Sequence, residues 1–267
     1  MNVVSYELAN GLQMRVQSGG TGVPLLFVHG FPLDYSMWRS QVDGLSDSFQ
    51  AVIPDLRGFG DTPPLPGVAS MTDMADDLVL LLDKLAISQV VLVGLSMGGY
   101  IAWQFWLRHR SRLQGLVLCD TRAAADSAET AKSRRIMAER VRKEGCEFLV
   151  ETMVPRLFAE STMARSPEVV DSIQRVIRQA DPEGVAAALL GMAERPDMTS
   201  QLSRVDLPSL VICGESDVIS PPSEMRSIAE AMPQSRYVEI PDAGHLAPLE
   251  QPGAVNEAIR AFVQTLS

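Results

Sequence analysis

The chain has 267 residues, of which 46% are hydrophobic and 21% charged, enough to bury the core of one large domain or of a domain with an insertion. Its net charge of -10 argues against nucleic acid or an anionic membrane surface as the main partner, because both are bound by clustered Lys and Arg. Residues 1–20 lack the pattern of a secretory signal, and no apolar run approaches the roughly 18 residues of a membrane-spanning helix, so we expect a cytoplasmic protein.

Short β-type segments recur along the chain, and from the third onward they are nearly continuous runs of Val, Leu and Ile. Such runs are typical of strands that are covered on both faces of a mostly parallel sheet. Helix-length segments separate most of them, including residues 71–87, where apolar residues recur at helical spacing. The alternation predicts an α/β fold, with a mostly parallel eight-stranded sheet and helices on both faces. The expected strands are residues 3–8, 12–17, 24–30, 50–56, 89–95, 113–120, 207–215 and 236–241.

The alternation breaks once, between Thr121 and Arg204, where no convincing strand pattern occurs. A structureless loop of that length is improbable in a compact domain. We therefore predict that residues 121–204 form a helical cap inserted over one end of the sheet. Residues 1–120 and 205–267 then form the core. Within the insertion, helical patterns cover residues 128–145, 146–158, 166–180 and 181–195.

The three cysteines lie far apart, and two of them, Cys119 and Cys213, lie inside apolar runs. No CxxC spacing or nearby histidine accompanies them, so we interpret them as buried small side chains rather than disulfides, catalytic thiols or metal ligands. We predict no metal site.

The sequence GLSMG at residues 94–98 fits the pattern G-x-S-x-G, directly after an expected strand and before a helix-like segment. In that context the pattern holds a nucleophilic serine, here Ser96, at a strained strand-to-helix turn, and the glycines allow close packing around it. A plain turn with an incidental serine is the alternative. The glycine spacing fits neither a dinucleotide nor a phosphate-binding fingerprint, and we predict no cofactor.

A serine hydroxyl needs a base to take its proton, and the chain has three histidines. His109 lies among arginines near a helix end and is expected at the surface. His29 ends a buried strand and is expected to be structural. His245 lies in a loop after the last expected strand, at the sheet edge where α/β proteins collect their active sites. We predict that His245 is the base.

The histidine in turn needs a carboxylate that fixes its tautomer and stabilises its charged form. Asp217 follows the penultimate expected strand, and the resulting chain order is Ser96, Asp217, His245. An Asx turn or a helix cap is the alternative role for Asp217. Asp120, at the end of another expected strand, is the second candidate for the acid; we favour Asp217, because it lies on the strand next before the histidine loop.

Acyl transfer also needs hydrogen-bond donors aimed at the developing oxyanion. The backbone N–H of Met97, the residue after the serine, is the first expected donor. The second is the N–H of Phe31, which follows the strand at residues 24–30. Pro32 has no N–H and cannot serve. A plain turn remains the alternative for this HGFP segment.

The segments HGFPLD, DLRGFGDT, GLSMGG, GESDVISPP and GHLAPLEQP stand in the order found in the α/β-hydrolase superfamily, which the chain resembles over nearly its whole length. Within it, the chain is most similar to bacterial esterases, perhydrolase-type esterases and enol-lactone hydrolases. The resemblance implies that Ser96 is the nucleophile, Asp217 the acid and His245 the base. It also implies that Phe31 and Met97 are the oxyanion donors and that the insertion is a cap that shapes the pocket.

These patterns predict a serine esterase that cleaves small-molecule carboxylic esters through an acyl-enzyme. A lactonase or enol-lactone hydrolase would use the same residues, and a substrate with a carboxylate would favour a basic cap residue such as Arg122, Arg156 or Arg195. The alternative, which we favour, is that these arginines lie on solvated helix faces. A binding protein on the same scaffold, without turnover, is the hypothesis from another class. The expected pocket walls are apolar and suggest a neutral, partly hydrophobic acyl group. They are Phe31, Trp38, Met97, Met153, Leu157 and Phe158.

Overall fold

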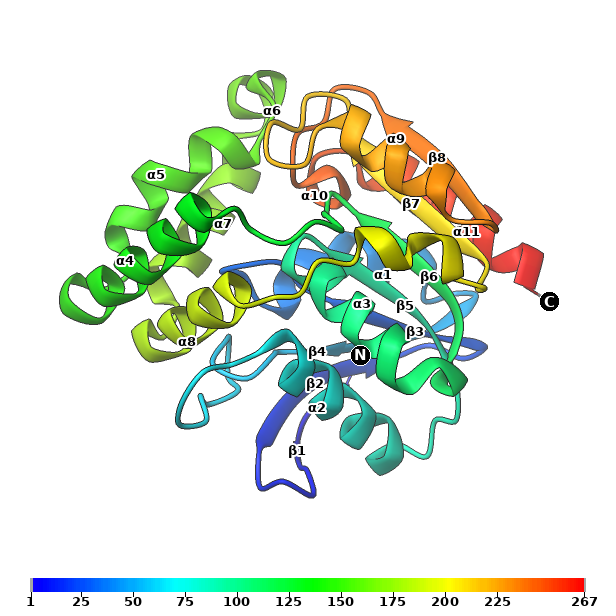
Figure 1. Ribbon diagram of the computed structural model, residues 1–267. Helices are drawn as coiled ribbons and strands as arrows, with labels where there is room; N and C mark the ends of the chain where they lie inside the picture. The colour runs from blue at the N-terminus through cyan, green and yellow to red at the C-terminus, as the bar shows by residue number, and fades with distance from the viewer. Residues whose placement is uncertain (1, 267) are drawn as a thin grey trace.

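An eight-stranded sheet forms the centre of the computed structural model, which describes residues 2–266 (Figure 1). Its strand order is β1-β2-β4-β3-β5-β6-β7-β8. Strand β2 pairs antiparallel with both β1 and β4, and all the other pairs are parallel. The predicted mostly parallel eight-stranded sheet is therefore confirmed. The strands are β1 Asn2–Glu7, β2 Gln13–Gly19, β3 Val23–Val28, β4 Phe49–Pro54, β5 Val90–Leu95, β6 Leu113–Cys119, β7 Ser209–Gly214 and β8 Ser235–Ile240.

Burial along the strands follows their composition. Every residue of β5 and of β7 is buried, as expected for apolar strands in the middle of a sheet that is covered on both faces. Strand β1 lies at one edge and most of its side chains are exposed. The three cysteines are buried and none forms a disulfide, as expected.

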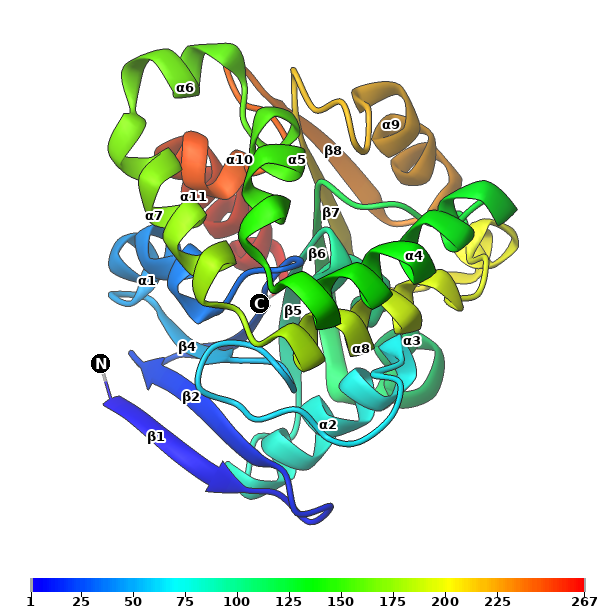
Figure 2. The same ribbon diagram turned by 90° about the vertical axis from the view of Figure 1, so that its left-hand side faces the viewer.

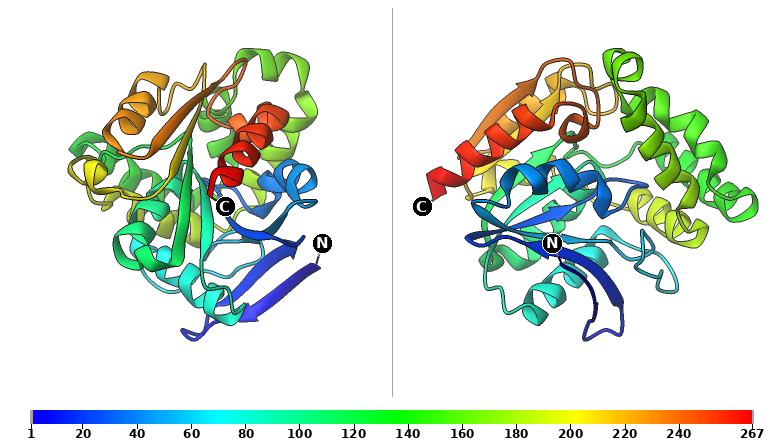
Figure 3. Two further views of the ribbon diagram at one scale, coloured as in Figure 1. Left: turned by 90° about the vertical axis from the view of Figure 1, so that its right-hand side faces the viewer. Right: turned by 180° about the vertical axis from the view of Figure 1, so that it is seen from behind.

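Helices cover both faces of the sheet. Helices α2, α3 and α9 lie on one face, and α1 and α11 pack together on the other, where Figure 3 shows them in blue and red from behind. Helix α2 begins with a capping box, in which Ser70 and Asp73 satisfy each other's backbone N–H. These helices are α1 Arg39–Leu45, α2 Met71–Lys84, α3 Met97–His109, α9 Pro222–Ala231, α10 Ala247–Glu250 and α11 Pro252–Val263.

Five helices, α4 to α8, lie between β6 and β7, and we call them the cap helices. They lie together in front of the sheet in Figure 2, with α4 packed against α8 and α7 packed against α5 and α6. Residues 121–204 contain helices and turns but no strand. Among residues 2–266, no helix is both long and apolar enough to cross a membrane. The cap helices are α4 Ala128–Glu144, α5 Glu147–Leu157, α6 Glu160–Arg165, α7 Pro167–Gln179 and α8 Pro182–Ala193.

Candidate active site

Ser96 lies at a sharp turn between β5 and α3. Its backbone has φ 52° and ψ -112°, in the left-handed region that side chains other than glycine rarely adopt. A Cβ added to Gly94 would lie 2.5 Å from the carbonyl oxygen of Gly98, and one added to Gly98 would collide with the carbonyl oxygen of Val28. Both glycines are therefore needed for the strand, the turn and the helix to approach this closely.

Ser96, His245 and Asp217 form one hydrogen-bonded chain. The Nε2 atom of His245 lies 2.8 Å from Ser96 Oγ, and its Nδ1 atom lies 2.8 Å from Asp217 Oδ2. Because Asp217 accepts the Nδ1 proton, Nε2 is left free to accept the proton of the serine hydroxyl. His245 and Asp217 are each only 3% exposed, whereas Ser96 is half-buried. The structure thus brings together three residues that are far apart in the sequence.

Asp217 is held as a carboxylate by several donors. Its Oδ1 accepts the N–H groups of Ile219 and Ser220, and its Oδ2 also accepts the hydroxyl of Ser220 at 2.7 Å. Burial raises the pKa of Asp217, but the attraction of His245 and these hydrogen bonds outweigh burial, so the pKa lies below its ordinary value. Ser220 was not predicted, although its place three residues after Asp217 in GESDVISPP is a usable signal.

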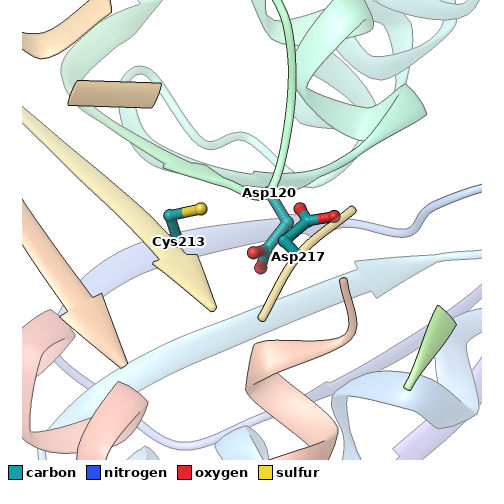
Figure 4. Close-up of side chains that lie close together, drawn as sticks. All are labelled: Asp120, Cys213 and Asp217. Carbon is teal, nitrogen blue, oxygen red and sulfur yellow. The ribbon is translucent and has the colours of Figure 1, made fainter. Parts of the chain in front are cut away.

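Asp120, the other candidate acid, lies close to Asp217 but has a different environment (Figure 4). Its Oδ1 accepts the N–H of Gly214 at 2.8 Å, and its buried Oδ2 has no partner among residues 2–266. Burial, together with the nearby charge of Asp217, raises its pKa well above the ordinary value. Only Asp217 contacts His245, so the geometry supports Asp217 as the acid.

The thiol of Cys213 lies beside these two carboxyl groups, with ligand atoms within 4.8 Å of one another. Burial and the neighbouring carboxyl groups raise the pKa of this thiol far above its ordinary value. The thiol donates weak hydrogen bonds to the carbonyl oxygens of Gly214 and Ser220. Cys213 and Asp217 are therefore both engaged in hydrogen bonds within this cluster.

The two predicted oxyanion donors belong to segments that adjoin Ser96. Met97 is the first residue of α3, where a backbone N–H has no partner inside the helix. Phe31 follows Gly30, which packs on the turn, since a Cβ added to Gly30 would lie 3.4 Å from Ser96 Cβ. Within the described chain, neither Met97 nor Phe31 donates its N–H to another residue.

The two other histidines are not part of this chain of hydrogen bonds. His29 is buried, with Nδ1 3.0 Å from the carbonyl oxygen of Gly30 and Nε2 3.0 Å from the N–H of Leu56. Burial lowers the pKa of His29 to about 4, so the ring is neutral and accepts at Nε2. His109 is partly exposed and pairs with Asp76. Both positions agree with the structural and surface roles expected of them.

A cavity of about 360 Å³ lies between the sheet edge and the cap helices. Three of its lining residues are neighbours of the hydrogen-bonded chain: Phe31, Tyr100 one turn after Ser96, and Ile219, whose N–H donates to Asp217. The cavity therefore lies beside the triad. The lining residues are Phe31, Tyr100, Arg122, Asp126, Thr130, Ser133, Arg134, Met137, Thr152, Met153, Arg156, Leu189 and Ile219.

The predicted pocket walls are only partly on this cavity. Phe31 and Met153 line it, whereas Trp38 is fully buried, with its ring tilted against that of Phe27 at a centroid distance of 5.2 Å. Met97, Leu157 and Phe158 are also buried and are not among the residues that line this cavity. Of the predicted pocket walls, the structure therefore does not place Trp38, Met97, Leu157 and Phe158 on this cavity, because their side chains are packed in the core.

The cavity is also more polar than expected. Asp126 accepts hydrogen bonds from both Arg134 and Arg195, and the guanidinium of Arg195 stacks 4.1 Å from the ring centre of Tyr100. Burial raises the pKa of Asp126, but these two arginines outweigh burial and the net change is downward. Through Asp126 and Arg134, this network forms an ion-paired part of the cavity wall.

Two further arginines line the cavity. Arg122 makes a two-pronged pair with Glu224, with both contacts at 2.8 Å. Arg156, on α5, is exposed and has no acidic partner within 4.0 Å among residues 2–266. Arg195, in contrast, is buried behind Asp126 and does not line the cavity. Arg156 is therefore the cation of this cavity that is left to meet a ligand.

Known proteins with similar sequences and structures include esterases and enol-lactonases. The family described as alpha/beta hydrolase fold matches residues 23–252. The 3-oxoadipate enol-lactonase 2 of Acinetobacter baylyi is 28% identical over 240 residues, which cover 90% of this chain and 88% of that protein. A solved thermophilic esterase from Thermogutta terrifontis, with malate bound, has a TM-score of 0.97 and 50% identity, covering 100% of this chain and 99% of that chain. The solved enol-lactonase of Burkholderia xenovorans has a TM-score of 0.90 and 29% identity, covering 97% of this chain and 99% of that chain.

Proposed function

The chain belongs to the alpha/beta hydrolase fold family, and we propose that within this family it is a carboxylic ester hydrolase. The observation that carries the proposal is the buried chain of two 2.8 Å hydrogen bonds from Ser96 through His245 to Asp217. The similarity to esterases and to enol-lactonases, which also cleave an ester linkage, supports the same reaction. The proposed partner is a small-molecule ester that occupies the cavity beside the triad.

In the first half of the proposed reaction, Ser96 Oγ attacks the ester carbonyl carbon while His245 Nε2 takes the hydroxyl proton. The carbonyl oxygen becomes an oxyanion, which accepts the N–H groups of Phe31 and Met97. The tetrahedral intermediate then collapses, and the bond from carbon to the leaving oxygen breaks. His245 gives its proton to that oxygen, so the alcohol departs neutral and the acyl group stays on Ser96.

In the second half, water replaces the alcohol. His245 takes a proton from the water as its oxygen attacks the acyl carbon, and the same N–H donors hold the second oxyanion. The bond to Ser96 Oγ breaks, and the proton returns to that oxygen as the carboxylic acid forms. Asp217 stabilises the charged imidazole in both halves and remains an ionised carboxylate throughout.

Hydrolysis of p-nitrophenyl acetate, butyrate and octanoate tests the proposal, with Ser96→Ala as the control. Loss of a triad nucleophile should lower kcat on the order of a millionfold, because no other group in the site can form the acyl-enzyme. Wild type and Ser96→Ala that are equally slow on all three esters would overturn the proposal. That result, combined with saturable ester binding, would favour a binding protein without turnover.

A second candidate is hydrolysis of esters or lactones that carry a carboxylate. Arg156 supports it as a cavity cation without an acidic partner, and Arg122 lines the same space. The similar esterase was solved with malate, a dicarboxylate, bound. Monoethyl glutarate and ethyl pentanoate differ mainly in charge, so the ratio of their kcat/KM values measures this preference.

The change Arg156→Gln should lower kcat/KM for monoethyl glutarate about tenfold and leave ethyl pentanoate unchanged, because it removes one charge-assisted contact. The matched control is Arg165→Gln, an exposed arginine on α6 away from the cavity. A wild-type enzyme that prefers the neutral ester, or equal losses on both esters, would exclude this candidate but not the esterase proposal.

A further inference from the structure

The loop that carries His245 is held in place by a half-buried carboxylate that the proposed reaction does not use. Glu250 is the last residue of α10, five positions after His245. Its Oε1 accepts the N–H of Gly244 at 2.8 Å and the N–H of Leu246 at 3.2 Å. These are the residues immediately before and after His245, so one oxygen of Glu250 fixes the backbone on both sides of the histidine.

The other oxygen of Glu250 reaches the cap helices. Its Oε2 accepts the N–H of Ala159 at 2.8 Å and the hydroxyl of Thr162 at 2.7 Å. Ala159 connects α5 to α6, and Thr162 lies in α6. The two oxygens of one carboxylate therefore hold the histidine loop and the cap at a fixed separation.

The two segments also touch directly through their backbones. Leu246 N–H lies 3.2 Å from the carbonyl oxygen of Leu157, in addition to its bond with Glu250. A Cβ added to Gly244 would lie 2.6 Å from the backbone nitrogen of Ala159 and 2.8 Å from the carbonyl carbon of Phe158. Because no side chain fits between them, a shift of the α5–α6 connection has to move the histidine loop or separate from it.

Glu250 itself is well satisfied and remote from the reacting atoms. Burial raises the pKa of Glu250, and the hydrogen bonds from Thr162, Ala159, Gly244 and Leu246 oppose that rise by stabilising the carboxylate. Its oxygens contact neither the imidazole of His245 nor the hydroxyl of Ser96. The hydrogen bonds of Glu250 therefore reach the reacting groups only through the backbone of the loop, while its negative charge also contributes to the raised pKa of Asp120.

We infer that Glu250 is a positioning residue that sets the distance from His245 Nε2 to Ser96 Oγ. Through Glu250, that distance depends on the position of the α5–α6 connection of the cap. The inference rests on the proposed role of His245 as the base. A carboxamide in place of the carboxylate would offer an NH₂ group to one pair of donors, so either the loop or the cap connection would be released. Misplacement of a reacting group by about 1 Å costs on the order of a hundredfold in rate.

The test compares Glu250→Gln with wild type on p-nitrophenyl acetate, with kcat, KM and the urea midpoint measured on the same folded preparations. We expect kcat to fall by about ten- to a hundredfold with little change in KM, because binding in the cavity does not need the imidazole in place. Glu230→Gln is the matched control. Glu230 is an exposed glutamate on α9 with no contact to the histidine loop, and both kcat and KM should stay unchanged.

Thr162→Val keeps the inference testable if Glu250→Gln does not fold. It removes only the hydroxyl that holds the cap side, and we expect a several-fold fall in kcat, in the same direction, at nearly unchanged stability. A folded Glu250→Gln that keeps the wild-type kcat while its urea midpoint falls would overturn the inference, as would an unchanged kcat in Thr162→Val if Glu250→Gln is unfolded. A wild-type protein without turnover dependent on Ser96 would instead overturn the proposed function itself.

Discussion

The sheet edge and the cap helices both contribute to the site, but they constrain it to different degrees. At the edge, Ser96 lies directly after β5 in a turn whose glycines leave no space for other side chains, and Asp217 is held by three donors. The cap supplies half-buried or exposed walls such as Met153 and Arg156, which have room to move. In the proposed function, the sheet edge supplies the residues that break the ester bond, and the cap selects the molecule that reaches them.

After the loss of the nucleophile itself, the largest expected effect comes from the acid at the sheet edge. Asp217→Asn should lower kcat by roughly ten-thousandfold for every ester, because an amide cannot hold the tautomer of His245 that accepts the serine proton. Asp120→Asn is the matched change on the adjacent strand and should retain most of the activity, since Asp120 does not contact His245. Near-normal kcat in Asp217→Asn would mean that the edge does not determine the chemistry in this way.

An intermediate effect is expected on the acid stability of the same edge. Folded His29 has a pKa of about 4, below the ordinary value of 6.5, so between these values the unfolded chain binds a proton that the folded protein does not. The free energy of unfolding should therefore fall as the pH falls from 6.5 to 4, by up to about 3 kcal/mol from this group. In His29→Gln that part of the pH dependence should be absent.

Urea unfolding near pH 7 and near pH 4.5 gives the change in the free energy of unfolding between these pH values for each protein. This change is independent of any loss of stability that the substitution causes equally at both pH values. Parallel pH dependences in wild type and His29→Gln would show that His29 is not held neutral by burial.

The smallest effect is expected from the cap. Met153→Ala enlarges the cavity, and the ratio of kcat/KM for p-nitrophenyl octanoate to that for the acetate should rise by about tenfold, because a few methylene groups gain space. Met163→Ala, on α6 and away from the cavity, is the control. An unchanged ratio would mean that acyl chains bind elsewhere. A large fall in kcat on both esters would mean that this cap residue also affects the chemical step at the sheet edge.

The same contrast explains what could be predicted from the sequence. Continuous apolar runs and a serine between required glycines are local sequence patterns. The sheet, Ser96 and the order of Asp217 and His245 could therefore be predicted. Trp38 was misplaced because nothing in the sequence distinguishes a large apolar side chain in the core from one on a cavity wall. Glu250 was missed for a related reason, since its four donors come from segments about 90 residues apart.

The helices of the cap were also easier to predict from the sequence than the residues with which they line the cavity. Residues 128–145 and 181–195 were predicted as helices and correspond to α4 and α8. Which of their faces meets the cavity depends on how the helices pack on each other, and that packing has no local signal. For the same reason the ion-paired wall around Asp126 and the free charge of Arg156 emerged only from the structure.

The central claim is that Ser96 is an activated nucleophile, and covalent labelling tests it without knowledge of the substrate. Wild-type protein treated with a fluorophosphonate should gain a single adduct, which mass spectrometry should locate on Ser96, and His245→Gln should be labelled far more slowly because the proton has no acceptor. Labelling at another residue, or none on Ser96 at concentrations that saturate known serine hydrolases, would contradict the claim.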